Sequence, residues 1–180
     1  MDNQSKALIG SWIQAIGTTI SAVGSTPSPE REKAFTTSLD LWGNVLQGTG
    51  NALIADSEKM SLDKLGNMTQ SVGNMVNVVG FLTDVSEKME TELNIKGNLI
   101  QAVGGGMSLA DTLNEEPTTD AFYDIYGNLL QIIGNSMQSI GGIKELKGID
   151  GEIINITGSW IQAIGSILAL IGAAKGTWDS

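Results

Sequence analysis

The chain contains no cysteine and no histidine. Without cysteine it has no disulfide, no thiolate nucleophile and no cysteine metal site. The cysteine count therefore does not indicate whether the protein resides in an oxidising or a reducing compartment. Without histidine it lacks the most common general base and metal ligand, which excludes serine–histidine–aspartate and histidine–zinc chemistry. Aromatic residues make up only 5% of the chain, whereas 41% of it is hydrophobic. The composition therefore predicts a small, aliphatic core.

Basic residues are also scarce, with ten Lys and Arg against twenty Asp and Glu and a formal net charge of −10. This balance opposes a nucleic-acid partner, because phosphate contacts require Lys and Arg. It also opposes charge-driven binding to anionic lipid and favours solubility. A length of 180 residues is enough for one domain with a sizeable core.

Glycine is abundant and regularly spaced, with 23 residues in the chain. The octapeptide at residues 10–17 recurs letter for letter at residues 158–165. Each copy has Ser or Asn after the first glycine, Gln at the fourth step and Gly again at the seventh. Regular spacing of this kind is typical of a helical repeat protein. Four weaker copies begin at Gly43, Gly66, Gly97 and Gly127.

The period of seven favours helices over strands, because a half-buried strand would alternate at two. The sequence therefore predicts an all-α protein: a single repetitive domain over residues 1–180, with six antiparallel helices joined by short loops. An up-down bundle and a short layered array both fit this pattern. We expect Ser28, Ser61, Ser86, and Thr118 or Thr119 to cap the second to fifth helices. The predicted repeats cover residues 4–24, 29–55, 61–82, 86–113, 118–146 and 151–174.

The heptad glycines fall almost on one line along each helix, and the glutamine lies beside that line. Each helical glycine costs about 0.8–1 kcal/mol relative to alanine, so their sum is on the order of 10 kcal/mol. Close approach of helix backbones, with dispersion and Cα–H···O contacts, would offset this cost. The glutamines would then hydrogen-bond beside the seam and fix its register. The candidate seam and interaction residues are Gly10, Gly17, Gly43, Gly50, Gly66, Gly73, Gly97, Gly104, Gly127, Gly134, Gly158, Gly165, Gln14, Gln47, Gln70, Gln101, Gln131 and Gln162.

An alternative interpretation places this Gly, Gln and Asn side in water, as the wet face of amphipathic helices. Exposed faces normally carry Lys and Glu, however, and the central heptads carry neither. The opposite side of each helix is bulky and apolar, so neither side is charged. We therefore expect the outer side of the helices to contact something other than water.

The favoured function is a non-enzymatic structural or interaction protein that self-associates through its Gly, Gln and Asn seams. A homo-oligomer is expected, and a different protein partner is compatible with the same surface. The near-identity of the first and last copies would allow head-to-tail stacking of chains, although duplication within one closed monomer explains it equally well.

Membrane association is the alternative function. Small residues and amides between helices suit packing in lipid, and the charge-free spans 7–29 and 153–174 are long enough to cross a bilayer. Spans 41–55 and 97–110 are too short for a helix of about 20 residues, which disfavours a membrane protein.

An enzyme is the least favoured class. The acidic pairs Glu115/Glu116 and Asp120/Asp124 could exchange protons or bind a hard cation. At a loop and a helix start, they are better explained as solubilising charges that pair with the helix dipole. The sequence has no phosphate-binding loop, nucleophile elbow or EF-hand motif. We expect no catalytic residue, no metal site and no cofactor.

The iterated pattern, as in Gly-Asn-Leu-Leu-Gln-Ile-Ile-Gly at residues 127–134, resembles a small uncharacterised repetitive family of spore-forming Gram-positive bacteria. The resemblance covers nearly the whole chain and implies no activity, ligand or site residue. It implies a cytoplasmic or spore-associated protein. Residues 7–23 have the apolar character of a signal peptide, but the same octapeptide recurs near the other end of the chain. We therefore interpret residues 5–24 as the first repeat.

Overall fold

The chain folds into six helices and, in its described ranges, has no strand. The computed structural model describes residues 1–29, 31–114 and 118–178. The predicted all-α class with six helices is confirmed. The helices are α1 (Asn3–Ser25), α2 (Lys33–Ser57), α3 (Leu62–Leu82), α4 (Glu87–Thr112), α5 (Thr119–Leu146) and α6 (Glu152–Trp178).

Three of the predicted helix caps are present. The Ser61 side chain accepts a hydrogen bond from the Lys64 N–H at 2.9 Å, and the Thr118 side chain accepts one from the Ala121 N–H at 3.1 Å. Ser86 caps α4 in the same way. These side chains satisfy backbone donors that have no partner within the helix.

The predicted start of the second helix at residue 29 is wrong. Helix α2 begins at Lys33, and its N-cap residue Glu32 makes no side-chain cap. The Arg31 guanidinium instead donates hydrogen bonds to the carbonyls of Val23, at 2.7 Å, and Thr26, at 2.9 Å. Arg31 thus satisfies carbonyls at the end of α1, and residues 26–32 connect the two helices.

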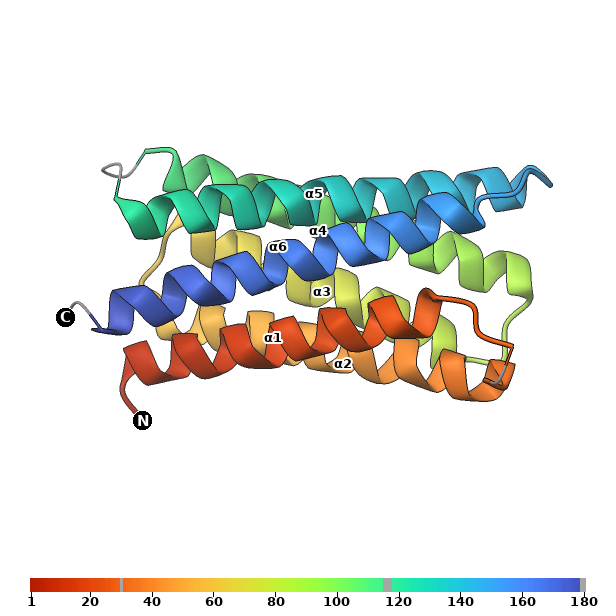
Figure 1. Cartoon of the computed structure of the whole chain (residues 1–180), viewed down its shortest axis with the longest axis horizontal. Helices are drawn as coiled ribbons and strands as arrows, with labels where there is room; N and C mark the ends of the chain where they lie inside the picture. Colours follow the sequence, from red (N-terminus) through yellow and green to blue (C-terminus); the bar gives the residue numbers. More distant parts are fainter. Residues whose placement is uncertain (30, 115–117, 179–180) are drawn as a thin grey trace.

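The helices form a closed ring. Each helix packs on the next one in the sequence, and α6 packs on α1. No other two helices come into backbone contact within the described ranges. Figure 1 shows all six lying along the long axis of the molecule, with both termini at one end. The ring is therefore an up-down bundle rather than an open array, and the near-identical first and last copies lie side by side in one chain.

The ring is built from three tight pairs, α1/α2, α3/α4 and α5/α6, whose backbones meet at paired glycines. A Cβ atom on Gly134 of α5 would lie 2.5 Å from the Gly158 carbonyl oxygen of α6. A Cβ on Gly158 would lie 2.7 Å from the Gly134 oxygen. Only a hydrogen atom fits in these places. The same reciprocal contact occurs at Gly10/Gly50, Gly17/Gly43, Gly66/Gly104, Gly73/Gly97, Gly127/Gly165 and Gly141/Gly151.

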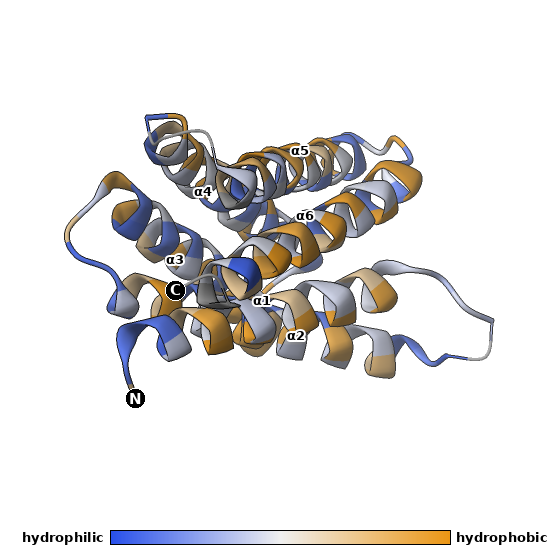
Figure 2. Cartoon of the chain, turned by 60° about the vertical axis from the view of Figure 1, so that its left-hand side comes forward, coloured by the Kyte–Doolittle hydropathy of each residue, from blue (hydrophilic) through white to orange (hydrophobic). Residues whose placement is uncertain are grey.

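The interior of the ring is polar, which overturns the expectation of an aliphatic core. Among the described residues, Ile95 and Leu170 are the only buried apolar side chains larger than alanine. Most other buried side chains belong to Gln, Asn, Ser and Thr. The large apolar residues point outward, and Figure 2 shows hydrophobic residues along all six helices. Paired glycines leave the narrow inner side to small and polar residues, so the bulky side must face out.

We expect Gly134→Ala to lower the free energy of unfolding by about 2–4 kcal/mol, because the added methyl group would overlap backbone atoms of α6. Gly106→Ala is the matched control, since a Cβ on Gly106 meets nothing within 4 Å. That change should stabilise the protein by up to about 1 kcal/mol through helix propensity. Urea denaturation of both variants measures the difference. Equal stabilisation of both would show that the α5 and α6 backbones are not in contact.

Candidate functional site

The polar lumen of the ring is the candidate site, because it gathers all the residues singled out from the repeats. The twelve glycines predicted from the repeats as seam residues are buried, and none of the six predicted glutamines is more than 5% exposed. The interpretation of this side as a water-exposed face is therefore wrong. Helical period places each glutamine on the same side as the glycine seam, and ring closure turns that side inward.

Gln162 of α6 is the hub of the lumen. Its amide nitrogen donates hydrogen bonds to Gln47 Oε1, at 2.9 Å, and to Gln101 Oε1, at 3.2 Å. Its carbonyl oxygen accepts a hydrogen bond from the Gln138 amide at 2.9 Å. One side chain therefore connects α6 to α2 and α4, which lie across the lumen, and to its neighbour α5.

A second bond between glutamines crosses the lumen. The Gln14 amide of α1 donates to Gln131 Oε1 of α5 at 3.0 Å. Gln70 is buried without such a bond: within the described part of the chain its side chain has no hydrogen-bond partner, and it packs against Gly104. Five of the six predicted glutamines therefore bond to another glutamine.

Asparagines that were not among the predicted site residues join α2, α3 and α4. The Asn77 amide donates to Asn44 Oδ1 at 2.9 Å and to Asn98 Oδ1 at 3.1 Å. A signal was present, since Asn44 and Asn98 each directly follow the first glycine of a repeat. Gln138 was also missed, because it lies one heptad beyond the glutamine of its own repeat.

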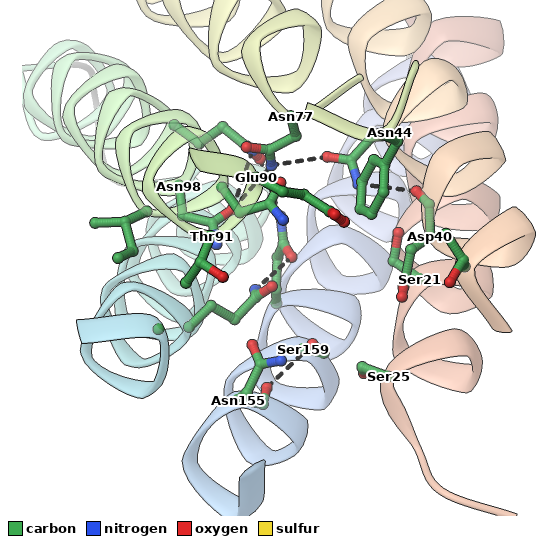
Figure 3. Close-up of a pocket in the computed structure, with 18 of the residues that line it drawn as sticks. Ser21, Ser25, Asp40, Asn44, Asn77, Glu90, Thr91, Asn98, Asn155 and Ser159 are labelled. Carbon is green, nitrogen blue, oxygen red and sulfur yellow. Dashed lines mark hydrogen bonds between the residues drawn. The ribbon is translucent and has the colours of Figure 1, made fainter. Parts of the chain in front are cut away.

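The hydrogen-bonded glutamines around Gln162 form a layer across the lumen. On one side of this glutamine layer the lumen widens into a cavity of about 280 Å³ lined by residues of all six helices. It extends from Gln101 and Gln162 to Ser25 and Glu145, which lie in the last turns of α1 and α5. Figure 3 shows side chains from both sides of the ring facing one another across this space. The cavity therefore has a floor of amides and reaches one end of the bundle.

The lining includes three carboxyl groups, those of Asp40, Glu90 and Glu145. Burial raises the pKa of Asp40 to about 7. Burial also raises the pKa of Glu145, and the negative charges of Glu152 and Asp150 add to the shift. Desolvation disfavours the charged form of a carboxyl group, so these groups hold protons more strongly than usual.

Metal binding by the described residues can be checked against the positions of their acidic side chains. No three carboxylates lie close enough together among them to hold a metal ion. Glu115 and Glu116 lie outside the described residues, as does the side chain of Asp120. The proton-exchange and cation roles considered for the acidic pairs are therefore not tested. The lumen itself is suited to hydrogen bonding by amides, hydroxyls and the carboxyl groups at its wide end.

We expect Gln162→Met to lower the free energy of unfolding by about 2–4 kcal/mol, because three glutamine partners, of which Gln47 and Gln101 are buried, would lose a hydrogen bond. Gln70→Met is the control, since it replaces a buried glutamine that makes no side-chain hydrogen bond within the described chain. It should cost less than about 1.5 kcal/mol. Denaturant unfolding compares the two, and equal losses would mean that the cross-lumen bonds do not stabilise the ring.

We expect Asp40→Asn to stabilise the protein at pH 8 and to leave its stability unchanged at pH 4. The folded-state pKa of Asp40, about 7, is raised above the ordinary value of 3.8 because the carboxyl group is buried. The folded chain therefore binds the proton more tightly, and stability is lost as the pH rises from about 4 to 7. Removing the charge should recover on the order of 2 kcal/mol at pH 8. Thermal unfolding from pH 4 to 8 measures this, and parallel curves for wild type and variant would contradict the shift.

Comparison with known proteins gives a family but no activity. No curated protein and no solved structure matches the chain. By length and composition alone, two of the described helices could cross a membrane: α1 and residues 152–176 of α6. Buried helices of other proteins pass the same test, so this is weak support for a membrane location. Residues 5–170 match the family described as a family of unknown function, DUF6944, and the chain belongs to that family.

Proposed function

We propose that this chain is a non-enzymatic, membrane-associated protein whose apolar outer surface is covered by lipid acyl chains. The observation that supports the proposal is the outer belt, defined as the exposed large apolar residues in the charge-free parts of the helices. Its members include Ile9, Trp12, Ile16, Trp42, Leu65, Met68, Val72, Met75, Val79, Leu99, Val103, Leu129, Ile133, Ile140, Trp160, Ile164, Ile167 and Ile171.

The outer belt surrounds the ring, since every helix contributes to it. Trp12 of α1 is 53% exposed and Ile164 of α6 is 51% exposed, although both lie near the middle of their helices. A protein–protein interface usually needs one apolar face, and a soluble monomer rarely exposes a large contiguous patch. Lipid covers all faces at once, so it accounts for an apolar surface that continues around the ring.

The shortness of two charge-free spans counts less against a membrane once it is known which way the charged side chains beside them point. Asp40, next to span 41–55, lines the cavity and does not interrupt the outside of α2. Glu90 of α4 also lines the cavity. Exposed Lys96 borders span 97–110, which is about 21 Å long at 1.5 Å per residue. A lysine at such a border can extend its amine to the headgroups, and a bilayer can thin to match a short span.

Self-association remains the second candidate, because the formal charge of −10 and the scarcity of basic residues fit a soluble assembly better. The glycine seams are occupied within the chain, so copies would have to associate through the outer belt instead. Relatives in spore-forming bacteria and a cytoplasmic or spore-associated location stay predictions from the sequence.

Flotation with phosphatidylcholine vesicles, at neutral and acidic pH, tests the proposal. We expect the wild-type chain to float and Ile164→Glu to stay at the bottom of the gradient, because the new charge enters the outer belt. Met60→Glu is the matched control, since Met60 is 78% exposed in the α2–α3 loop, outside the belt. It should float like the wild type.

Light scattering without lipid or detergent separates the remaining outcomes. A wild-type chain that does not float and forms a discrete oligomer would overturn the lipid proposal and support self-association. A wild-type chain that does not float and runs as an 18.9 kDa monomer would overturn both.

A further inference from the structure

The cavity at the wide end of the lumen is lined by amide side chains that the described part of the chain leaves partly unused. Asn98 of α4 lines the cavity beside Gln101 and is only 8% exposed. Its Oδ1 atom accepts a hydrogen bond from Asn77 at 3.1 Å. Its Nδ2 atom donates none within the described ranges and, unlike the Oδ1 atom of Asn77, keeps accessible surface. The Asn98 nitrogen is therefore a buried donor that a molecule in the cavity can reach.

Two more amides with unused groups line the cavity from α5 and α6. The side chain of Asn155, near the start of α6, makes no hydrogen bond through its oxygen or its nitrogen in the described part of the chain, and both atoms keep accessible surface. Gln138 of α5 donates to Gln162, whereas its own Oε1 atom accepts nothing in the same ranges. Figure 3 shows Asn98 and Asn155 on separate helices that border the same space. The cavity thus offers both amide donors and amide acceptors.

Hydroxyl groups on the walls add further acceptors. Ser25, Thr91 and Ser159 line the cavity, and each donates its hydroxyl hydrogen to a carbonyl of its own helix, at 3.2, 2.9 and 3.1 Å. A hydroxyl group that has donated its hydrogen still has lone pairs on its oxygen. A ligand that complements this lining must therefore both donate and accept hydrogen bonds.

The charge of the lining favours a neutral ligand. Asp40, Glu90 and Glu145 line the cavity, and no Lys or Arg is among the described residues around it, which opposes an anion. Burial raises the pKa of Asp40 to about 7, and burial also raises the pKa of Glu145. These two carboxyl groups therefore carry less charge near neutral pH than carboxyl groups in water. A protonated carboxyl group donates and accepts hydrogen bonds, as a hydroxyl group does.

We propose that this cavity binds a small neutral polyol with a single six-membered ring, whose hydroxyl groups pair with the lining amides and hydroxyls. Each hydroxyl group of a polyol donates one hydrogen bond and accepts others, which matches walls that offer both kinds of group. The cavity volume of about 280 Å³ is close to the lower limit of small-molecule pockets, about 300 Å³, so it suits one ring rather than a chain of sugars.

The glutamine layer around Gln162 closes the deep end of the cavity, so the ligand enters and leaves at the wide end. This assignment does not depend on what covers the outer belt.

Calorimetric titration of the full chain with myo-inositol and with glucose tests the inference, in buffer or, if the chain floats with them, in phosphatidylcholine vesicles. We expect saturable one-to-one binding of at least one of these polyols. Cyclohexanol should not bind, because it has a ring of the same size but only one hydroxyl group. Absence of saturable binding of both polyols, or equally tight binding of cyclohexanol, would overturn the assignment.

Asn98→Asp should weaken polyol binding at least about tenfold, because it removes the buried donor and keeps an oxygen that accepts from Asn77. Asn128→Asp is the matched control. It makes the same exchange at the same repeat position, directly after the first glycine, and Asn128 does not line the cavity. Its affinity should stay within about twofold of the wild type.

Equal losses in the two variants would contradict the inference, since the added negative charge would then explain both. Unchanged affinity in Asn98→Asp would contradict it as well. If Asn98→Asp does not unfold cooperatively in denaturant, the comparison of the polyols with cyclohexanol on the wild-type chain decides the matter.

Discussion

Contact between helix backbones at paired glycines is the constraint on which the rest of this structure depends. At Gly134 and Gly158 each carbonyl oxygen occupies the place where the other residue would carry a Cβ atom. Dispersion and Cα–H···O contacts at such points offset the low helix propensity of glycine. The contact also decides which side of each helix faces in, because bulky residues cannot fit beside backbones that touch.

The polar lumen follows from that geometry. A ring of six close helices leaves a space narrow enough for a glutamine to reach helices that are not its neighbours, as Gln162 reaches α2 and α4. Buried amides are tolerated where they are paired. Each bond between two of these side chains requires a particular axial register of the two helices that carry them. The glycine pairs therefore set the distance between helices, and the glutamines specify how the helices are aligned.

Much of the fold could be predicted from the sequence, because the heptad signal is repeated six times. The helices, the Ser61 and Thr118 caps and the shared side of the glycines and glutamines all follow from local period and capping chemistry. Whether the glycine and glutamine side faces the interior or the outside of the ring could not be predicted, since both sides of each helix lack charge. The usual preference for apolar interiors predicted an aliphatic core and was wrong. The start of α2 was missed because a distant contact, from Arg31 to the end of α1, overrides the local signal of Ser28 and Pro29.

The ring has polar side chains inside and large apolar side chains outside, and this arrangement has a thermodynamic consequence. Folding normally gains most of its free energy by removing large apolar side chains from water, at roughly 25 cal/mol per Å². Here Trp12, Ile164 and the rest of the outer belt stay exposed, so the isolated ring forgoes much of that gain. The glycine contacts and the amide bonds hold the ring together without using the apolar side chains. Any surrounding that covers the outer belt then adds the hydrophobic free energy of removing these side chains from water to a ring that is already formed. The stability of the fold is therefore linked directly to its environment.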